Sequence, residues 1–122
     1  MSVLYILMLL LVLVVIISHI AFMLMEVVFW THPKVRRIFA MSEEKAIDSK
    51  VLASNVGLYN GCLAAGLIWG LWEGSLSLLT FFLCSISIAG FYGGFTAKRS
   101  ILYIQALPAV LALVLVWINY SY

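Results

Sequence analysis

Two residues whose side chains could take part in chemistry, an acid and an imidazole, lie within the first long apolar run of this sequence. Glu26 is the only acid well inside such a run, and His19 precedes it by seven residues. Because seven residues make nearly two helical turns, His19, Met23 and Glu26 share one helix face. Polar side chains in lipid are costly and often mark ion or substrate pathways. This pair could bind a cation, relay a proton or act as general acid and base.

Later apolar segments carry polar residues that we expect at similar depths in the membrane. Counted from the nearest basic residue at 1.5 Å per residue, Asn55, Tyr92 and Gln105 lie roughly 8–9 Å inside the boundary, near the level of the acid. Asn60 is expected deeper, nearer the level of the imidazole, and Tyr59 lies one turn from Asn55 on the same face. The candidate ligand- or proton-binding residues are Glu26, His19, Asn55, Tyr59, Asn60, Tyr92 and Gln105.

Two interpretations of this polar layer stay open. In the structural one, Glu26 is protonated or hydrogen-bonded by Asn55, Gln105 or Tyr92, and the network fixes the register of the helices. In the functional one, the layer lines a cavity that opens to the cytoplasm. Pro108 adds to the layer, because it has no N–H and leaves the carbonyl of Ile104 without its helical partner beside Gln105.

The composition requires lipid as the solvent of this chain. Hydrophobic residues make up 66% of the sequence and charged residues 10%, and the mean hydropathy is +1.17. A soluble domain carries about 25% charged residues, which cover its surface. At 122 residues the chain is expected to form one domain, 1–122, of the all-α class. The architecture expected is an integral membrane four-helix bundle.

Four spans account for most of the length. They are predicted over residues 2–30, 49–72, 76–96 and 101–119, with a cytoplasmic interfacial segment over 31–48. Pro33 ends the first span, and the basic and apolar residues over 34–41 suit a short interfacial helix. His32 is expected to be only an interfacial residue. Ser42 followed by two acids is typical of a helix start.

The basic residues set the orientation. All seven lie in or beside the first and third connections: Lys34, Arg36, Arg37, Lys45, Lys50, Lys98 and Arg99. The positive-inside rule places these two connections in the cytoplasm and therefore both termini on the other side. The aromatic residues agree, with Trp69, Trp72, Trp117, Tyr120 and Tyr122 at the expected outer interface and Trp30 at the inner one.

Glycine pairs four residues apart predict where helices approach each other. The pairs are Gly57 and Gly61, Gly66 and Gly70, and Gly90 and Gly94. Without side chains, neighbouring backbones can come close, which holds helices together in lipid. We expect these faces to pack within the chain, although a homodimer surface would show the same spacing.

Several kinds of site are not indicated by the sequence. It has no metal-ligand cluster, nucleophile elbow or phosphate-binding loop, so no metal and no cofactor are expected. Cys62 and Cys84 lie in separate apolar segments and form no CxxC pair, which suggests buried, inert thiols. The basic residues are explained by topology, so nucleic acid is not an expected partner. The expected partners are membrane lipid, a second copy of the chain and an unidentified small-molecule or lipid ligand.

Three stretches of the sequence resemble a known family. They are HIAFMLMEVVFWTHPKVRRIF at residues 19–39, VLASNVGLYNGCLAAGLIWGL at 51–71 and TAKRSILYIQALPAVLA at 96–112. Together they look like the domain-of-unknown-function 1304 family, small four-helix membrane proteins found widely in bacteria. The resemblance implies a multi-pass protein of the bacterial cytoplasmic membrane and suggests that Glu26, Asn55, Asn60 and Gln105 belong to recurring motifs. The family pattern usually has glutamine where this chain has Val56.

Three classes of function follow from these observations. The first is a small transporter or binding protein for a cation or an amphiphilic molecule, with Glu26 as the exchangeable acid. The second is a membrane enzyme acting on a lipid or isoprenoid, with His19 and Glu26 as an acid–base pair and Asn55, Tyr59 and Gln105 positioning a head group. The third is an accessory or assembly protein that docks another membrane protein. The first is favoured by a small margin.

Overall fold

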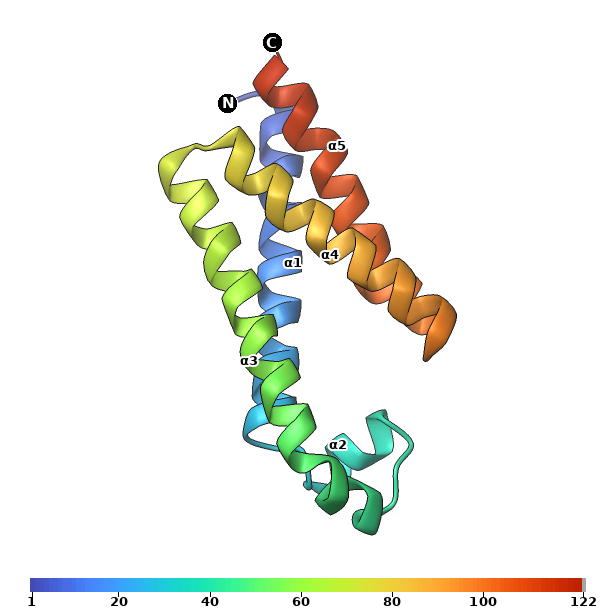
Figure 1. Ribbon diagram of the computed structural model, residues 1–122. Coiled ribbons are helices and arrows are strands. Elements are labelled where there is room, and N and C mark those ends of the chain that lie inside the picture. The colour runs from blue at the N-terminus through green and yellow to red at the C-terminus, as the bar shows by residue number, and fades with distance from the viewer. Residues whose placement is uncertain (122) are drawn as a thin grey trace. The chain divides into compact units, whose positions relative to one another are not determined.

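The computed structural model describes residues 1–121 and is built of helices. In chain order these are α1 (Val3–Val27), α2 (Pro33–Ile38), α3 (Glu43–Glu73), α4 (Leu76–Thr96), the π-helical turn η1 (Leu102–Ala106) and α5 (Leu107–Ser121) (Figure 1). The expected all-α class is confirmed. The interfacial position expected for Tyr122 lies outside the described residues.

Within residues 1–121, four helices are long and apolar enough to cross a membrane: α1, α3, α4 and the continuous stretch Leu102–Ser121 formed by η1 and α5. Large apolar side chains stand exposed along them, for example Ile17 at 63%, Phe81 at 65% and Ile88 at 69%. A surface of this kind requires lipid around it, since a soluble protein rarely exposes large contiguous apolar patches. The structure therefore fits a multi-pass membrane protein.

Two helix boundaries lie more than two residues from the predicted span boundaries. Helix α1 ends at Val27, earlier than the predicted end of the first span, and a turn follows in which the amide of His32 donates to the carbonyl of Phe29 at 2.9 Å. Helix α3 begins at Glu43, well before its apolar part. Its start is the one that the sequence indicates, because Ser42 Oγ accepts the amide of Lys45 at 3.2 Å.

The chain divides into two compact units, which are described separately. One comprises Met1–Ser18 with Leu63–Tyr122, and the other comprises His19–Cys62. The core of the first unit takes side chains from all four long helices. Its fully buried members include Met8 and Val12 of α1, Leu67 of α3, Leu83 of α4 and Val116 of α5.

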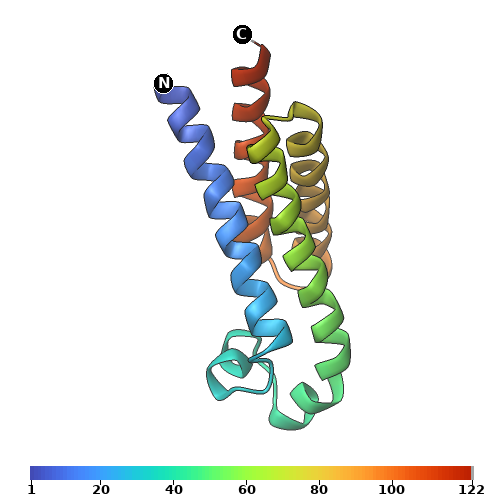
Figure 2. The ribbon, with the colours of Figure 1, turned by 90° about the vertical axis from the view of Figure 1, so that its left-hand side faces the viewer.

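Glycines bring helix surfaces together in the first unit. Gly66 and Gly70 of α3 face Phe82 and Leu79 of α4. Farther along α4, a Cβ at Gly90 would lie 2.7 Å from the backbone nitrogen of Ala106 in η1, and Gly94 faces Leu102 of the same turn. Figures 1 and 2 show α4 running beside η1 and α5. The glycine faces predicted from spacing thus contact helices of the same chain.

The π-helical turn is a consequence of Pro108. Proline in a helix has no N–H, and its ring collides with the carbonyl four residues earlier, here that of Ile104. The chain responds by widening: the amide of Leu107 donates to the carbonyl of Leu102, five residues back. The widened turn carries Gln105 and packs on Gly90. The sequence indicated the unpaired carbonyl but not the widening.

One end of the first unit gathers both tails and the α3–α4 turn. Asn119 Nδ2 of α5 donates to the carbonyl of Leu4 in α1 at 3.3 Å. A Cβ at Gly74, which turns the chain between α3 and α4 with φ +60°, would lie 3.8 Å from the hydroxyl of Tyr120. The two tails and the second connection therefore lie at one end of this unit.

The thiols depart from expectation. Cys62 is exposed and Cys84 is half-buried, so the expectation of two buried thiols is wrong for Cys62. The reason is the helical position, because Gly61 faces Met23 of α1 and the next residue is turned by about 100° away from that contact.

A pair of matched glycine substitutions tests the close approach of α4 to η1. We expect Gly90→Ala to lower stability by about 1–3 kcal/mol, because the new methyl group meets backbone atoms that cannot move aside. A Cβ at Gly93 would lie 3.4 Å from the nearest atom, the flexible Ile101 Cγ2. Gly93→Ala should leave the melting temperature in detergent unchanged or raise it, since alanine is the better helix former. Equal losses in the two variants would contradict this packing.

Candidate functional site

The second unit, His19–Cys62, is built from the last turns of α1, from α2 and from α3 as far as Cys62 (Figures 1 and 2). Helices α1 and α3 approach closely at Gly57. A Cβ there would lie 2.8 Å from Glu26 Cβ and 2.8 Å from Val27 Cγ2, and one at Gly61 would collide with Met23. The two small residues therefore bring α3 against the helix face that carries the candidate acid.

At this approach the side chain of Glu26 meets that of Asn60. Asn60 Nδ2 donates a hydrogen bond to Glu26 Oε2 at 2.7 Å, and both residues are half-buried. We call these two residues the Glu26–Asn60 pair. Asn60 lies within the apolar part of α3, ten residues beyond Lys50. The structure thus confines a carboxyl group between two apolar helices and gives it a neutral amide as partner.

The residue that bonds to Glu26 is not the one that the depth count placed level with it. Asn55 was expected level with Glu26 and Asn60 deeper, yet the bond is to Asn60. The depth count considered Cα atoms alone. Side chains on a helix lean toward its N-terminus, so Glu26 reaches farther from the end of α1 than its Cα does. Another contact between these segments, from Trp30 to Ser49, lies eleven residues of α3, about 16 Å, before Asn60. The Glu26–Asn60 bond is therefore well inside the apolar part of α3.

Asn55 and Tyr59 do not join the pair. Each lies two residues from Gly57, which turns it about 160° away from the side of α3 that contacts α1. Asn55 is exposed, and its Nδ2 donates to the carbonyl of Val51 in its own helix at 2.9 Å. Tyr59 is 67% exposed. Both stay candidates for contact with a ligand, from a different face of α3.

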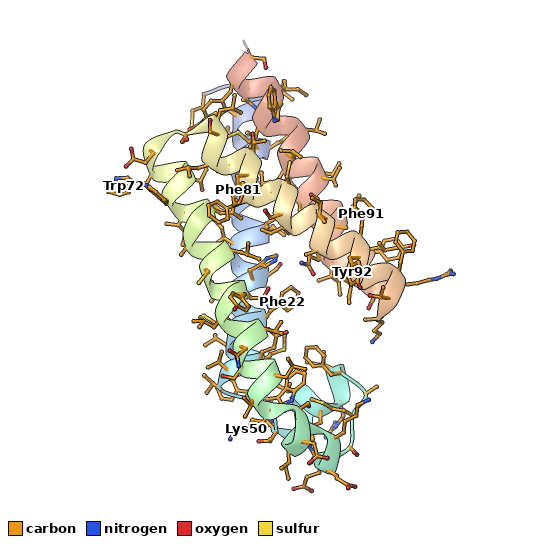
Figure 3. All side chains as sticks on the ribbon, viewed as in Figure 1. Phe22, Lys50, Trp72, Phe81, Phe91 and Tyr92 are labelled. Atoms are coloured by element: carbon orange, nitrogen blue, oxygen red, sulfur yellow. The ribbon has the colours of Figure 1, made fainter. Side chains whose placement is uncertain are left out.

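His19 is buried, with 1% of its surface exposed. Its ring meets that of Phe22 edge-on, with centroids 5.5 Å apart and planes at 75°; Figure 3 labels Phe22. A buried imidazole in an aromatic contact is less accessible to a ligand than the half-buried carboxyl of Glu26.

The remaining candidates, Tyr92 and Gln105, lie in the first unit. Tyr92 is 72% exposed near the end of α4 (Figure 3), and Gln105 is half-buried in η1. Gln105 therefore sits in a π-helical turn, a feature that often occurs at functional sites.

Two side chains of the second unit have roles that the sequence did not indicate. Trp30 Nε1 donates to Ser49 Oγ at 3.0 Å, and its ring packs on Phe39 with centroids 4.8 Å apart. This contact ties the turn after α1 to both α3 and the end of α2. His32, expected only as an interfacial residue, caps α2, because its Nδ1 accepts the amide of Lys34 at 3.2 Å.

Matched asparagine substitutions test the Glu26–Asn60 pair. We expect Asn60→Leu to lower stability by about 1–3 kcal/mol, because it keeps the volume but leaves a half-buried carboxyl without its donor. Asn55→Leu removes an amide that bonds only within its own helix, and we expect a change within about 0.5 kcal/mol. Thermal unfolding of both variants in one detergent measures the difference. A loss in Asn55→Leu as large as that in Asn60→Leu would argue against the pair.

Comparison with known proteins places the chain in a family. The family described as "Protein of unknown function (DUF1304)" matches residues 13–117. "Uncharacterized protein YpaA" of Lactococcus lactis subsp. lactis (strain IL1403) is 34% identical over 82 residues, which cover 64% of this chain and 69% of the relative. No solved structure matches the chain. The resemblance drawn from the sequence is confirmed: the chain belongs to the DUF1304 family.

Proposed function

We propose that this chain is a multi-pass protein of the bacterial cytoplasmic membrane that binds and transports a cationic or amphiphilic small molecule at the Glu26–Asn60 pair. The observation that carries the proposal is the hydrogen bond of 2.7 Å from Asn60 to a half-buried carboxyl between α1 and α3. Acids placed inside apolar helices commonly serve ion and proton pathways.

The kind of partner matters to this argument. A carboxyl group held by arginine or lysine has its charge compensated by that partner. Glu26 is held by an amide, which supplies one hydrogen bond and no charge. A carboxyl group in this state can still take up a proton or a cation. The half-buried position keeps it within reach of a ligand.

The surroundings suit a ligand that is partly apolar. Val27 follows the acid in α1, faces Gly57 with it and is 41% exposed. A cation with apolar substituents could contact this side chain while its charge lies at the carboxyl. If a proton and the cation compete for the carboxyl, uptake of one releases the other, which couples their movements. Buried His19 makes the alternative of a His19–Glu26 acid–base pair less attractive.

We also propose that both tails and the α3–α4 turn face the non-cytoplasmic side. They lie at one end of the first unit, where Asn119 reaches Leu4. None of the seven basic residues falls in these three segments.

Glutamine in place of the acid tests the proposed binding site. Tetraphenylphosphonium serves as the probe because it is a cation surrounded by apolar groups. We expect saturable binding to the purified protein in detergent and at least about tenfold weaker binding to Glu26→Gln, since glutamine keeps the shape but removes the charge. In proteoliposomes containing a trapped pH-sensitive dye, the probe should drive proton movement with the unsubstituted protein and not with Glu26→Gln.

Glu73→Gln is the matched control. Glu73 is exposed at the end of α3 and belongs to the other unit. Its replacement should leave binding and proton movement unchanged. The proposal fails if Glu26→Gln binds the probe and moves protons as well as the control, or if the unsubstituted protein does neither.

Reporter fusions test the orientation. Alkaline phosphatase, which is active only outside the cytoplasm, should be active when fused after residue 121 and inactive when fused after residue 40 or residue 98. Green fluorescent protein at the same positions should give the opposite pattern. Activity of the phosphatase at residue 98 with none at residue 121 would reverse the proposed orientation.

A further inference from the structure

Helix α2 ends in a strained turn beside a group of cations. The amide of Met41 donates to the carbonyl of Arg36 at 3.0 Å, and that of Ala40 donates to Arg37 at 3.2 Å. This is the Schellman arrangement, whose turning residue is usually glycine. Here it is Ala40 with φ 50°, a conformation that costs a residue with a side chain about 1–2 kcal/mol. Strain of this size is often kept at binding sites.

The turn folds the chain around a shallow hollow. Its lining residues are Pro33, Arg36, Arg37, Ala40 and Met41, and we call it the basic hollow. No acid lies between Glu26 and Glu43 in the sequence, whereas Lys34, Arg36 and Arg37 fall in this interval. Two of the five lining residues are cations and none is an acid, so the hollow suits an anion.

Within the hollow, one donor needs a partner. Arg36 Nε is buried and makes no hydrogen bond within residues 1–121. A buried donor of a charged group without an acceptor is costly, and the cost is recovered when a ligand supplies the acceptor. The planar guanidinium group offers its donors in a fork that fits the oxygens of a phosphate.

Apolar side chains next to the basic hollow indicate where the anion comes from. Ile38 is 56% exposed and Phe39 is 38% exposed at the end of α2. Phe39 packs on Trp30, which also bonds to Ser49 and so fixes this segment against α3. Cations beside exposed apolar side chains, in a short helix next to membrane-spanning ones, are typical of the membrane interface. A phosphate that carries acyl chains would satisfy both features.

We propose that the basic hollow binds the phosphate of an anionic phospholipid, which accepts hydrogen bonds from Arg36 Nε and from the guanidinium group of Arg37. The site does not depend on Glu26 and goes beyond the proposed function. It gives the segment between α1 and α3 a specific lipid partner.

Lipid retention by the purified protein tests this site. Phosphatidylglycerol and phosphatidylcholine of the same acyl chains are titrated into the protein in detergent, and bound lipid is counted by native mass spectrometry. We expect phosphatidylglycerol to bind about tenfold more tightly, as one charge-assisted interaction allows. Arg36→Gln should reduce its affinity to that of phosphatidylcholine. Arg36→Lys should recover only part of the preference, because lysine keeps the charge but not the fork.

Arg99→Gln is the matched control, since it removes one exposed cation from the α4–α5 connection. It should retain the full preference. Arg37→Gln alters an exposed side chain and should weaken phosphatidylglycerol binding even if Arg36→Gln fails to fold. The proposal is overturned if both lipids bind equally to the unsubstituted protein, or if Arg37→Gln and any folded Arg36→Gln bind phosphatidylglycerol like the control. Displacement of the lipid by inorganic phosphate at equal concentration would also overturn it, because the site would then recognise a free ion.

Discussion

Close approach of helix backbones is the constraint on which this structure depends. Between helices in lipid there is no hydrophobic driving force, so association relies on van der Waals contact and on hydrogen bonds at short range. Glycine makes both available, as at Gly90, where a methyl group would lie 2.7 Å from a backbone atom of η1. The same device at Gly57 brings α3 close enough to α1 for the amide of Asn60 to reach Glu26. The packing and the candidate site therefore have one physical origin.

Most polar side chains on the long helices form their hydrogen bonds within their own helix. The hydroxyls of Ser18, Ser85, Ser87 and Thr96 donate to the carbonyl four residues earlier, and the amide of Asn55 does the same. Such bonds satisfy a polar group inside lipid without any second helix. A carboxylate cannot do this, because it only accepts hydrogen bonds and the carbonyls of its helix are acceptors too. When it is ionised, Glu26 must therefore receive its hydrogen bond from another helix or from a ligand, and this distinguishes it from the other polar residues.

The sequence predicted the helices well because their signals are local. Apolar length gave the four spans, Ser42 gave the start of α3, and glycine spacing gave the faces that pack. The site was harder, since it depends on side-chain reach and on rotation about the helix axis. A count of Cα depth favoured Asn55 as the neighbour of Glu26, whereas the rotation set by Gly57 selects Asn60. The π-helical turn before Pro108 and the cap formed by His32 were not predicted either, because each depends on how the backbone adjusts around an imino acid.

The same rotation bears on Val56, where the resemblance drawn from the sequence implies a glutamine. Its side chain is 45% exposed. Val56 precedes Gly57 by one residue and Asn60 by four, so on α3 it lies about 100° from Gly57 and only about 40° from Asn60, one turn away. The bond between Asn60 and Glu26 does not involve it. A glutamine at this position would therefore add a donor and an acceptor one turn from Asn60, beside the helix face on which the Glu26–Asn60 pair lies.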